Sequence, residues 1–157
     1  MAFQLRSGAF AEGTAIPKKF TCDGQSISPA LSWSGAPANA KTLALIMDDP
    51  DAPSGTYTHW VLYNIAPALS SLGEAVAGTR EVPGVGTQGS NSAGRTGYVG
   101  PCPPSGTHRY YFKLFALDAN LQLKPGLNAR ELQMSMGGHI LAQAWLMGRF
   151  SRQAPPG

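Results

Sequence analysis

Two stretches of the chain predict long strands inside a sheet. Residues 43–47 are all apolar and run directly into an acidic proline turn. An unbroken apolar run of this kind is typical of a strand that is buried on both faces. Residues 57–65 alternate between two faces that both carry apolar side chains. Because residues two apart on a strand point the same way, His59 is expected on the face of Val61, opposite Trp60.

A third strand is predicted over residues 108–118. His108 and Tyr110 would lie on one face of it, about 6.6 Å apart, so they could line one pocket together. The segment before it, residues 84–106, holds seven of the 19 glycines and few apolar side chains. A loop of this length within a compact domain is usually functional.

Shorter elements are expected around these strands. Residues 3–7 indicate an edge strand, and residues 28–33 a strand that enters from a proline. One helix is predicted, because Asn128 and Glu131 have the spacing of a capping box. An apolar stripe at helical spacing follows, made of Leu132, Met136, Ile140, Ala144 and Met147. The glycine pair at 137–138 should kink or divide this helix, and residues 149–157 should form a frayed tail.

The element pattern and the length set the fold class. The chain has 157 residues, which predicts one domain, residues 1–157. Mostly strands with one late helix indicate a mainly β protein with antiparallel sheets packed face to face.

Composition excludes some classes of function. Twelve basic against nine acidic residues give a formal net charge of +3. This excess is mild and no basic run stands out, so nucleic-acid binding is not expected. Residues 1–7 contain no apolar signal-peptide core, and no stretch approaches the roughly eighteen apolar residues of a membrane span. We therefore expect a cytoplasmic protein without integral membrane association.

Cys22 and Cys102 are the only cysteines of the sequence. Two cytoplasmic cysteines are more often free thiols than a bridge, and these two lack the paired spacing of a zinc site. Both lie in loops that should border the candidate site. We therefore also hypothesise that they are close enough to be joined on oxidation, which requires Cα atoms about 4.4–6.8 Å apart.

The acidic turn after the first inner strand is the main candidate for chemistry. Carboxylates next to a core are costly unless they are paired, and the chain offers His59 and His108 as partners. Asp49 and Asp51 are equally explained as turn residues that cap backbone N–H groups. Each histidine alone is more easily explained as a core imidazole. The presence of both histidines beside the acids favours a site.

Four segments resemble the signature of the phosphatidylethanolamine-binding protein family. They are Asp49-Pro50-Asp51-Ala52-Pro53, His59-Trp60, Gly100-Pro101 through Pro104, and His108-Arg109-Tyr110. Asn91, Gly94 and Gly97-Tyr98 resemble its bacterial Raf-kinase-inhibitor-like branch, of YbhB/YbcL type. The resemblance covers about residues 3–150, and paired signatures some fifty residues apart are specific.

The resemblance implies a β-sandwich with Greek-key connections and a C-terminal helix. It also implies a non-enzymatic pocket for a small anion or phosphorylated headgroup, no cofactor, and a homodimer. A protein partner, a kinase or another regulator, is left unidentified. The implied ligand-binding residues are Asp49, Asp51, Pro53, His59, Gly100, Pro101, His108 and Tyr110.

Individual roles follow from the residue types and the resemblance. Asp49 is implied to line the pocket, with Asp51 more structural, and Tyr110 to supply a hydroxyl donor. Gly100 has no side chain, so its amide could be approached by a ligand. Arg109 should point away from the pocket, because neighbours on a strand alternate.

A phosphate needs donors and positive charge, which two imidazoles, a phenol and loop amides can supply. We expect Asp49 to orient an imidazole and raise its pKa, which would keep it protonated. It could also accept a hydrogen bond from a headgroup amine or a protonated phosphate oxygen.

Two enzymatic alternatives use the same residues. A hydrolase would need a serine nucleophile, but no Gly-x-Ser-x-Gly elbow marks one. A metal site of His59, His108 and Asp49 would suit iron or zinc. We expect these three residues to converge in one small cavity at the end of an inner sheet under any of these functions.

Overall fold

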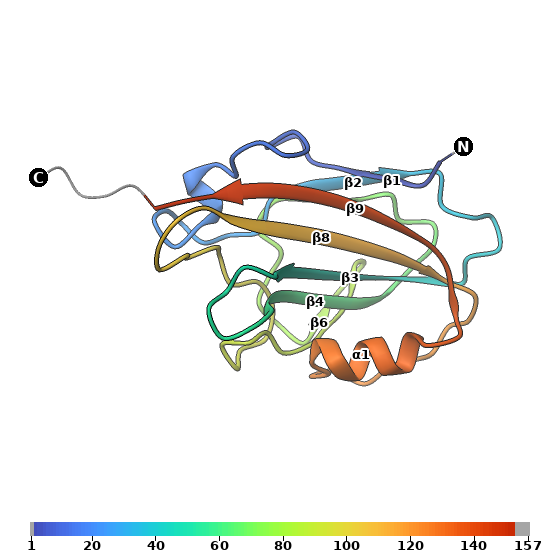
Figure 1. The fold of residues 1–157 in the computed structure, drawn as a ribbon. Helices are drawn as coiled ribbons and strands as arrows, with labels where there is room; N and C mark the ends of the chain where they lie inside the picture. Colours follow the sequence, from blue (N-terminus) through green and yellow to red (C-terminus); the bar gives the residue numbers. More distant parts are fainter. Residues whose placement is uncertain (1, 153–157) are drawn as a thin grey trace, which may run out of the picture.

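The computed structural model describes residues 2–152, which form two antiparallel sheets and one α-helix (Figure 1). The smaller sheet has the order β1 (Gln4–Arg6), β2 (Leu31–Ser34), β5 (Ser71–Leu72). The larger sheet has the order β6 (Glu81–Val82), β7 (Gly86–Gln88), β4 (Tyr57–Ile65), β3 (Thr42–Asp49), β8 (His108–Leu117), β9 (Ile140–Phe150). A 3-10 turn spans Lys18–Phe20, and helix α1 spans Ala129–Met136. The mainly β class with two antiparallel sheets is confirmed.

The main core fills the space between the two sheets. Leu31 and Trp33 of the smaller sheet pack in one cluster with Leu45 and Phe112 of the larger one. Strand β3 is buried along all eight of its residues, because a second apolar cluster covers its other face. This confirms the strand buried on both faces that the apolar run predicts.

Helix α1 packs on the outer face of the larger sheet (Figure 1). The side chain of Asn128 accepts a hydrogen bond from the N–H of Glu131 at 2.8 Å, and Glu131 Oε1 accepts from the N–H of Asn128 at 3.0 Å. The predicted capping box is therefore present. Leu132 and Met136 are buried against β3 and β4. Across residues 2–152, no helix has the length and apolar character needed to cross a membrane.

The prediction that the helical stripe continues to Met147 is wrong. The helix ends at Met136, and Gly138 (φ +80°) turns the chain into strand β9, which pairs with β8 along its length. The apolar residues fit both periods, since Ala144 and Leu146 are buried and alternate with residues that are exposed or half-buried. Residues 140–150 adopt the strand because they pair with the edge of the sheet that β8 would otherwise leave open. The helix therefore comes before this last strand and does not include it. Arg149 and Phe150, where the tail was expected to begin, belong to β9, and residues 153–157 lie outside the described residues.

Strand β4 contains a β-bulge beside His59. The pairing of β3 with β4 shifts by one residue between Met47 and Asp48, which leaves His59 as an extra residue opposite them. A bulge breaks the alternation of side chains. His59 consequently lies on the face that carries Tyr110, with ring centroids 5.3 Å apart, and not with Val61 in the second cluster.

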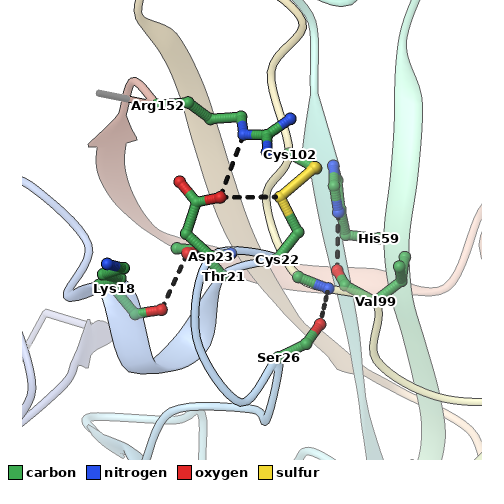
Figure 2. Close-up of a disulfide and its surroundings, with 10 residues drawn as sticks. Lys18, Thr21, Cys22, Asp23, Ser26, His59, Val99, Cys102 and Arg152 are labelled. Carbon is green, nitrogen blue, oxygen red and sulfur yellow. Dashed lines mark hydrogen bonds and ion pairs between the residues drawn. A yellow bond between two sulfur atoms is a disulfide. The ribbon is translucent and has the colours of Figure 1, made fainter. Parts of the chain in front are cut away.

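Cys22 and Cys102 form a disulfide, with Cα atoms 5.3 Å apart (Figure 2). The expectation of free thiols is wrong, and the hypothesis that the two cysteines lie close enough to be joined is confirmed. The bridge connects the loop after the 3-10 turn to the loop before β8, 80 residues later in the sequence. It therefore fixes two distant segments against each other at one end of the sandwich.

Candidate functional site

A cavity of about 370 Å³ lies where β3 ends and β8 begins. This volume is within the range of roughly 300–1,000 Å³ found for small-molecule sites. The lining residues come from three neighbouring strands and two loops: Asp49, Ala52, Pro53, Tyr57, His59, Val99, Gly100, Cys102, Pro103, Pro104, His108 and Tyr110. The predicted convergence of Asp49, His59 and His108 in one small cavity is confirmed.

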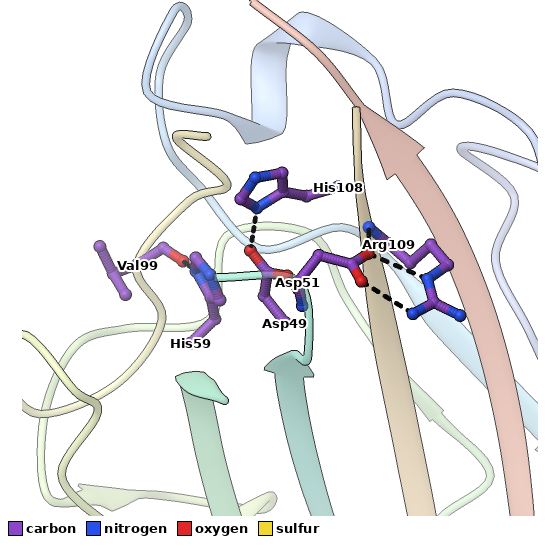
Figure 3. A network of polar contacts seen from close by, with 6 residues as sticks. All are labelled: Asp49, Asp51, His59, Val99, His108 and Arg109. Atoms are coloured by element: carbon purple, nitrogen blue, oxygen red, sulfur yellow. Dashed lines mark hydrogen bonds and ion pairs between the residues drawn. The ribbon is translucent and has the colours of Figure 1, made fainter. Parts of the chain in front are cut away.

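Asp49 holds two groups at once. Its Oδ2 lies 2.6 Å from Nδ1 of His108, and its Oδ1 accepts the N–H of Asp51 at 2.8 Å (Figure 3). The side chains of Asp49 and His108 are only 4% and 8% exposed. Because an ionised carboxylate only accepts, Nδ1 of His108 carries the proton and Nε2 is left for a ligand. Asp49 therefore caps its turn and also orients His108, so both explanations of this acid hold.

His59 is fixed by a backbone carbonyl. Its Nδ1 lies 2.7 Å from the oxygen of Val99 (Figure 3). A carbonyl only accepts, so Nδ1 carries the proton. Burial lowers the pKa of His59 below its ordinary 6.5, although the Val99 carbonyl and the charge of Asp49 act in the opposite direction. For His59 the cost of burying its charge is therefore larger than the effect of the neighbouring carboxylate, and the imidazole that Asp49 orients is that of His108.

Tyr110 forms part of the floor of the cavity. Its ring meets that of His59 edge-on at 5.3 Å and stacks beside that of His108 at 6.4 Å. The buried hydroxyl has no hydrogen-bond partner among the described residues 2–152. Burial raises the pKa of Tyr110, and so do the charges of Asp49 and Asp51 and the position of the Asp49 carboxylate as an acceptor close to the hydroxyl, so this group stays a neutral donor. Buried polar groups are rarely left unpaired, which makes this hydroxyl a natural contact for a ligand oxygen or a water.

Gly100 has a different role from the one expected. Its N–H donates to Oγ of Ser26 at 2.9 Å, so the amide is already used within the protein. A Cβ at Gly100 would lie 2.6 Å from this Oγ and 2.8 Å from the carbonyl oxygen of Phe20. The position therefore requires glycine because two loops approach closely there.

The loop that carries Gly100 forms the outer wall of the cavity, and three contacts fasten it. Besides the Ser26 bond, the hydroxyl of Tyr98 donates to the carbonyl of Phe20 at 2.6 Å. The third contact is the disulfide of Cys102 with Cys22 (Figure 2). The wall is completed by Pro103 and Pro104, which have no N–H to offer.

Two of the predicted ligand-binding residues lie outside the cavity lining. The carboxylate of Asp51 accepts from the backbone N–H and Nε of Arg109, both at 2.9 Å, and from its Nη2 at 2.7 Å (Figure 3). This pairing holds the pKa of Asp51 at about 2, below its ordinary 3.8. The carbonyl of Pro101 accepts from the N–H of Cys22 at 3.0 Å. Pro53, in contrast, does line the cavity.

The cavity also contains residues that sequence reasoning missed. The ring of Tyr57 lies 4.8 Å from that of His59. Its position two residues before His59 on one strand was the available signal. Val99 orients His59 through its backbone carbonyl. Every residue has such a carbonyl, so the sequence gives no signal for this role.

The enzymatic alternatives find little support in this geometry. Among the described residues, the cavity lining contains no serine, and its one cysteine is bridged. Residues 2–152 contain no group of three histidine, cysteine or acidic side chains placed to hold a metal ion. The carboxylate of Asp49 is hydrogen-bonded to Nδ1 of His108, so it orients this ring and does not face the same point in the cavity as Nε2.

A second hollow, of about 500 Å³, lies between β1 and β9. Its ionisable side chains, Arg6 and Glu12, are both exposed. The smaller cavity gathers buried polar groups and an unpaired hydroxyl, so it is the better candidate for specific binding.

Comparison with known proteins gives one consistent family. Residues 6–151 match the family model described as phosphatidylethanolamine-binding protein. A UPF0098 protein of Methanothermobacter thermautotrophicus is 50% identical over 148 residues, which cover 94% of this chain and 98% of the relative. A UPF0098 protein of Aquifex aeolicus is 48% identical over 152 residues, 95% of this chain and 88% of the relative.

Two crystal structures have the same fold. The phosphatidylethanolamine-binding protein homologue CT736 of Chlamydia trachomatis superimposes with a TM-score of 0.89 at 44% identity, covering 97% of this chain and 99% of that one. E. coli YbcL, described as a member of the mammalian PEBP family, gives a TM-score of 0.89 at 28% identity, covering 98% and 100%.

Proposed function

This chain belongs to the phosphatidylethanolamine-binding protein family, and we propose that it binds a small phosphate-type anion, free or as a phosphorylated headgroup, without catalysing a reaction. The observation that carries the proposal is that one small cavity contains two groups suited to an anion. One is the buried hydroxyl of Tyr110, which has no hydrogen-bond partner among the described residues, and the other is His108, whose Nδ1 is bonded to Asp49. Orientation by a carboxylate leaves Nε2 of His108 for a ligand.

Two groups would hold the anion. In its protonated form His108 donates through Nε2 and supplies positive charge, while the carboxylate of Asp49 partly offsets that charge. The hydroxyl of Tyr110 supplies a second donor from the cavity floor. The prolines at the rim exclude water from one side, which strengthens both interactions.

Calorimetric titration with phosphate and with phosphoethanolamine at about pH 6 tests the proposal. Removing His108 by His108→Ala should lower affinity by about ten-fold or more, since a charge-assisted hydrogen bond in a semi-enclosed site is lost. His139→Ala is the matched control, because Nδ1 of His139 also pairs with a carboxylate, Asp118 at 2.8 Å, but at the surface. Wild-type protein that binds neither ligand, or a loss of affinity as large in the control, would overturn the proposal.

The non-enzymatic part of the proposal rests on the composition of the lining. No serine lines the cavity within the described residues, and Cys102 is bridged, so neither supplies a nucleophile. Phosphorus NMR of phosphoethanolamine incubated with the protein should show unchanged ester, and release of phosphate would contradict this part.

We also retain a cytoplasmic location and a homodimer as proposals. Disulfides are rare in reducing compartments, so trapping the thiols of Cys22 and Cys102 in intact cells tests the location. A monomer mass in light scattering would reject the dimer. Nothing among the described residues identifies a protein partner, and we propose none.

A further inference from the structure

We propose that the cavity takes its phosphate ligand with one acidic proton still attached, and that Nε2 of His59 accepts the hydrogen bond from that proton. The inference rests on the proposed function and deepens it, because it names the class of ligand. Phosphate monoesters and inorganic phosphate can carry such a proton near neutrality, whereas sulfate esters and phosphate diesters cannot. The cavity should therefore discriminate between anions of the same shape and charge.

The orientation of the His59 ring is the first support. Its Nδ1–H donates to the carbonyl of Val99 at 2.7 Å, and this carbonyl is itself fixed because the N–H of Val99 donates to the backbone oxygen of His59 at 2.9 Å. The rings of Tyr57 and Tyr110 pack on His59 at 4.8 and 5.3 Å. Turning the ring over would face a C–H toward the carbonyl, so Nε2 is the nitrogen that remains for a ligand.

The charge state of His59 is the second support. The charged or titratable groups that face it are Asp49 from β3, His108 and Tyr110 from β8, and Tyr57 from its own strand. Asp49 would favour an imidazolium, but its oxygens already hold His108 and a backbone N–H. Burial lowers the pKa of His59 in spite of this carboxylate. A neutral ring with its proton on Nδ1 has a lone pair on Nε2, and a lone pair needs a donor.

The shortage of positive charge is the third support. Neither lysine nor arginine is among the residues that line the cavity within the described chain. Among the lining amides, that of Gly100 donates to Ser26 and that of Val99 donates to His59, and the three lining prolines have none. A phosphate dianion would lie near the carboxylate of Asp49 and the lone pair on Nε2 of His59. At most one imidazolium, that of His108, would balance this negative charge. A monoanion that keeps its proton matches the same groups, with acceptors toward His108 and Tyr110 and a donor toward His59.

Methyl phosphate and methyl sulfate isolate the proton. Both are tetrahedral, and the monoanion of methyl phosphate carries the same single charge as methyl sulfate. An alkyl phosphate loses its second proton near about pH 6, so the monoanion is the main form at about pH 5.5. Dimethyl phosphate is a further monoanion without an acidic proton. The three probes thus differ chiefly in whether a donor faces Nε2 of His59.

Titration calorimetry at about pH 5.5 should show methyl phosphate binding at least ten-fold more tightly than either other probe, because only it avoids two opposed lone pairs. Above about pH 6, affinity for total methyl phosphate should fall by a further ten-fold per pH unit relative to methyl sulfate, as the monoanion is depleted. Methyl sulfate does not titrate there, so the pH dependence of its binding reports the groups of the protein alone and is subtracted.

His59→Asn then tests the assigned atom. The asparagine amide can keep the hydrogen bond to the Val99 carbonyl, while the acceptor at the position of Nε2 is removed. Methyl phosphate affinity should fall to that of methyl sulfate, with methyl sulfate little changed. Equal affinity for both esters in the wild type would overturn this inference and leave the proposed function standing. Binding of neither ester would overturn the proposed function itself. If the variant does not fold, the wild-type series decides alone.

Discussion

Two acid–base pairs involve the same turn, but one pair is buried and the other is exposed to solvent. Asp49 and Asp51 stand two residues apart, and their partners His108 and Arg109 are neighbours on β8. In the first pair the acid and base side chains are 4% and 8% exposed, and in the second they are 27% and 46% exposed. The same kind of contact is therefore inside the cavity in one case and at the surface in the other.

The difference follows from strand geometry. Neighbouring residues on a strand point to opposite faces, so β8 sends His108 into the cavity and Arg109 away from it. An exposed ion pair is screened by water and contributes little to stability. A buried pair is expensive to break, because either partner alone is left with an unsatisfied polar group. We infer that the inner pair orients a ligand-binding ring, while the outer pair ties the turn to the strand.

The largest expected effect on stability comes from removing the disulfide that fastens the cavity wall beside the Asp49–His108 pair. The double variant Cys22→Ser, Cys102→Ser should lose roughly 4 kcal/mol of unfolding free energy, since a bridge across 80 residues restricts the unfolded chain strongly. Urea unfolding measures this loss. A reductant should destabilise the wild type by a similar amount and leave the double variant unchanged. Coinciding unfolding curves for oxidised and reduced wild type would show that the bridge contributes nothing.

The second effect tests the inner pair directly. Asp49→Ala should cost roughly 3 kcal/mol, because Nδ1 of His108 and the N–H of Asp51 both lose their acceptor in a buried setting. Asp49→Asn is the matched control, since its amide oxygen can still accept from one of the two groups, and it should cost less. Urea midpoints for both variants check the order. An alanine variant as stable as the asparagine variant would show that the Asp49–His108 pair does not contribute to stability.

The sequence predicted the parts of this comparison that depend on local pattern. The apolar run of β3, the capping box of α1 and the alternation that separates His108 from Arg109 are all visible in residues a few positions apart. The motif resemblance added which of these side chains should converge. Local pattern and the family signature were thus sufficient to predict the strands that carry the site and the convergence of Asp49, His59 and His108.

The remaining features depend on contacts between distant segments. The apolar residues within 140–147 have spacings that fit both a helix and a strand, and the structure pairs this segment with β8 as strand β9. The bulge that turns His59 toward Tyr110 is a mismatch between two strands and has no signature in either. The true constraint on Gly100 comes from Phe20 and Ser26, far away in the sequence.

The smallest expected effect comes from the outer pair. Asp51→Asn should lower the melting temperature by only roughly 1–3 °C at neutral pH, because the pair is exposed to solvent. Its pH dependence has a definite sign. The hydrogen bonds from Arg109 hold the pKa of Asp51 at about 2 in the folded protein, below its ordinary 3.8, so the folded state binds fewer protons than the unfolded state between these values. The stabilisation is therefore complete above about pH 4 and is lost as the pH falls toward 2. Melting curves of wild type and variant across this range, at low and high salt, should converge at low pH and also approach each other in high salt. A gap that stays constant with pH, or that exceeds the gap caused by Asp49→Ala, would show that the turn relies on the outer pair as much as on the inner one.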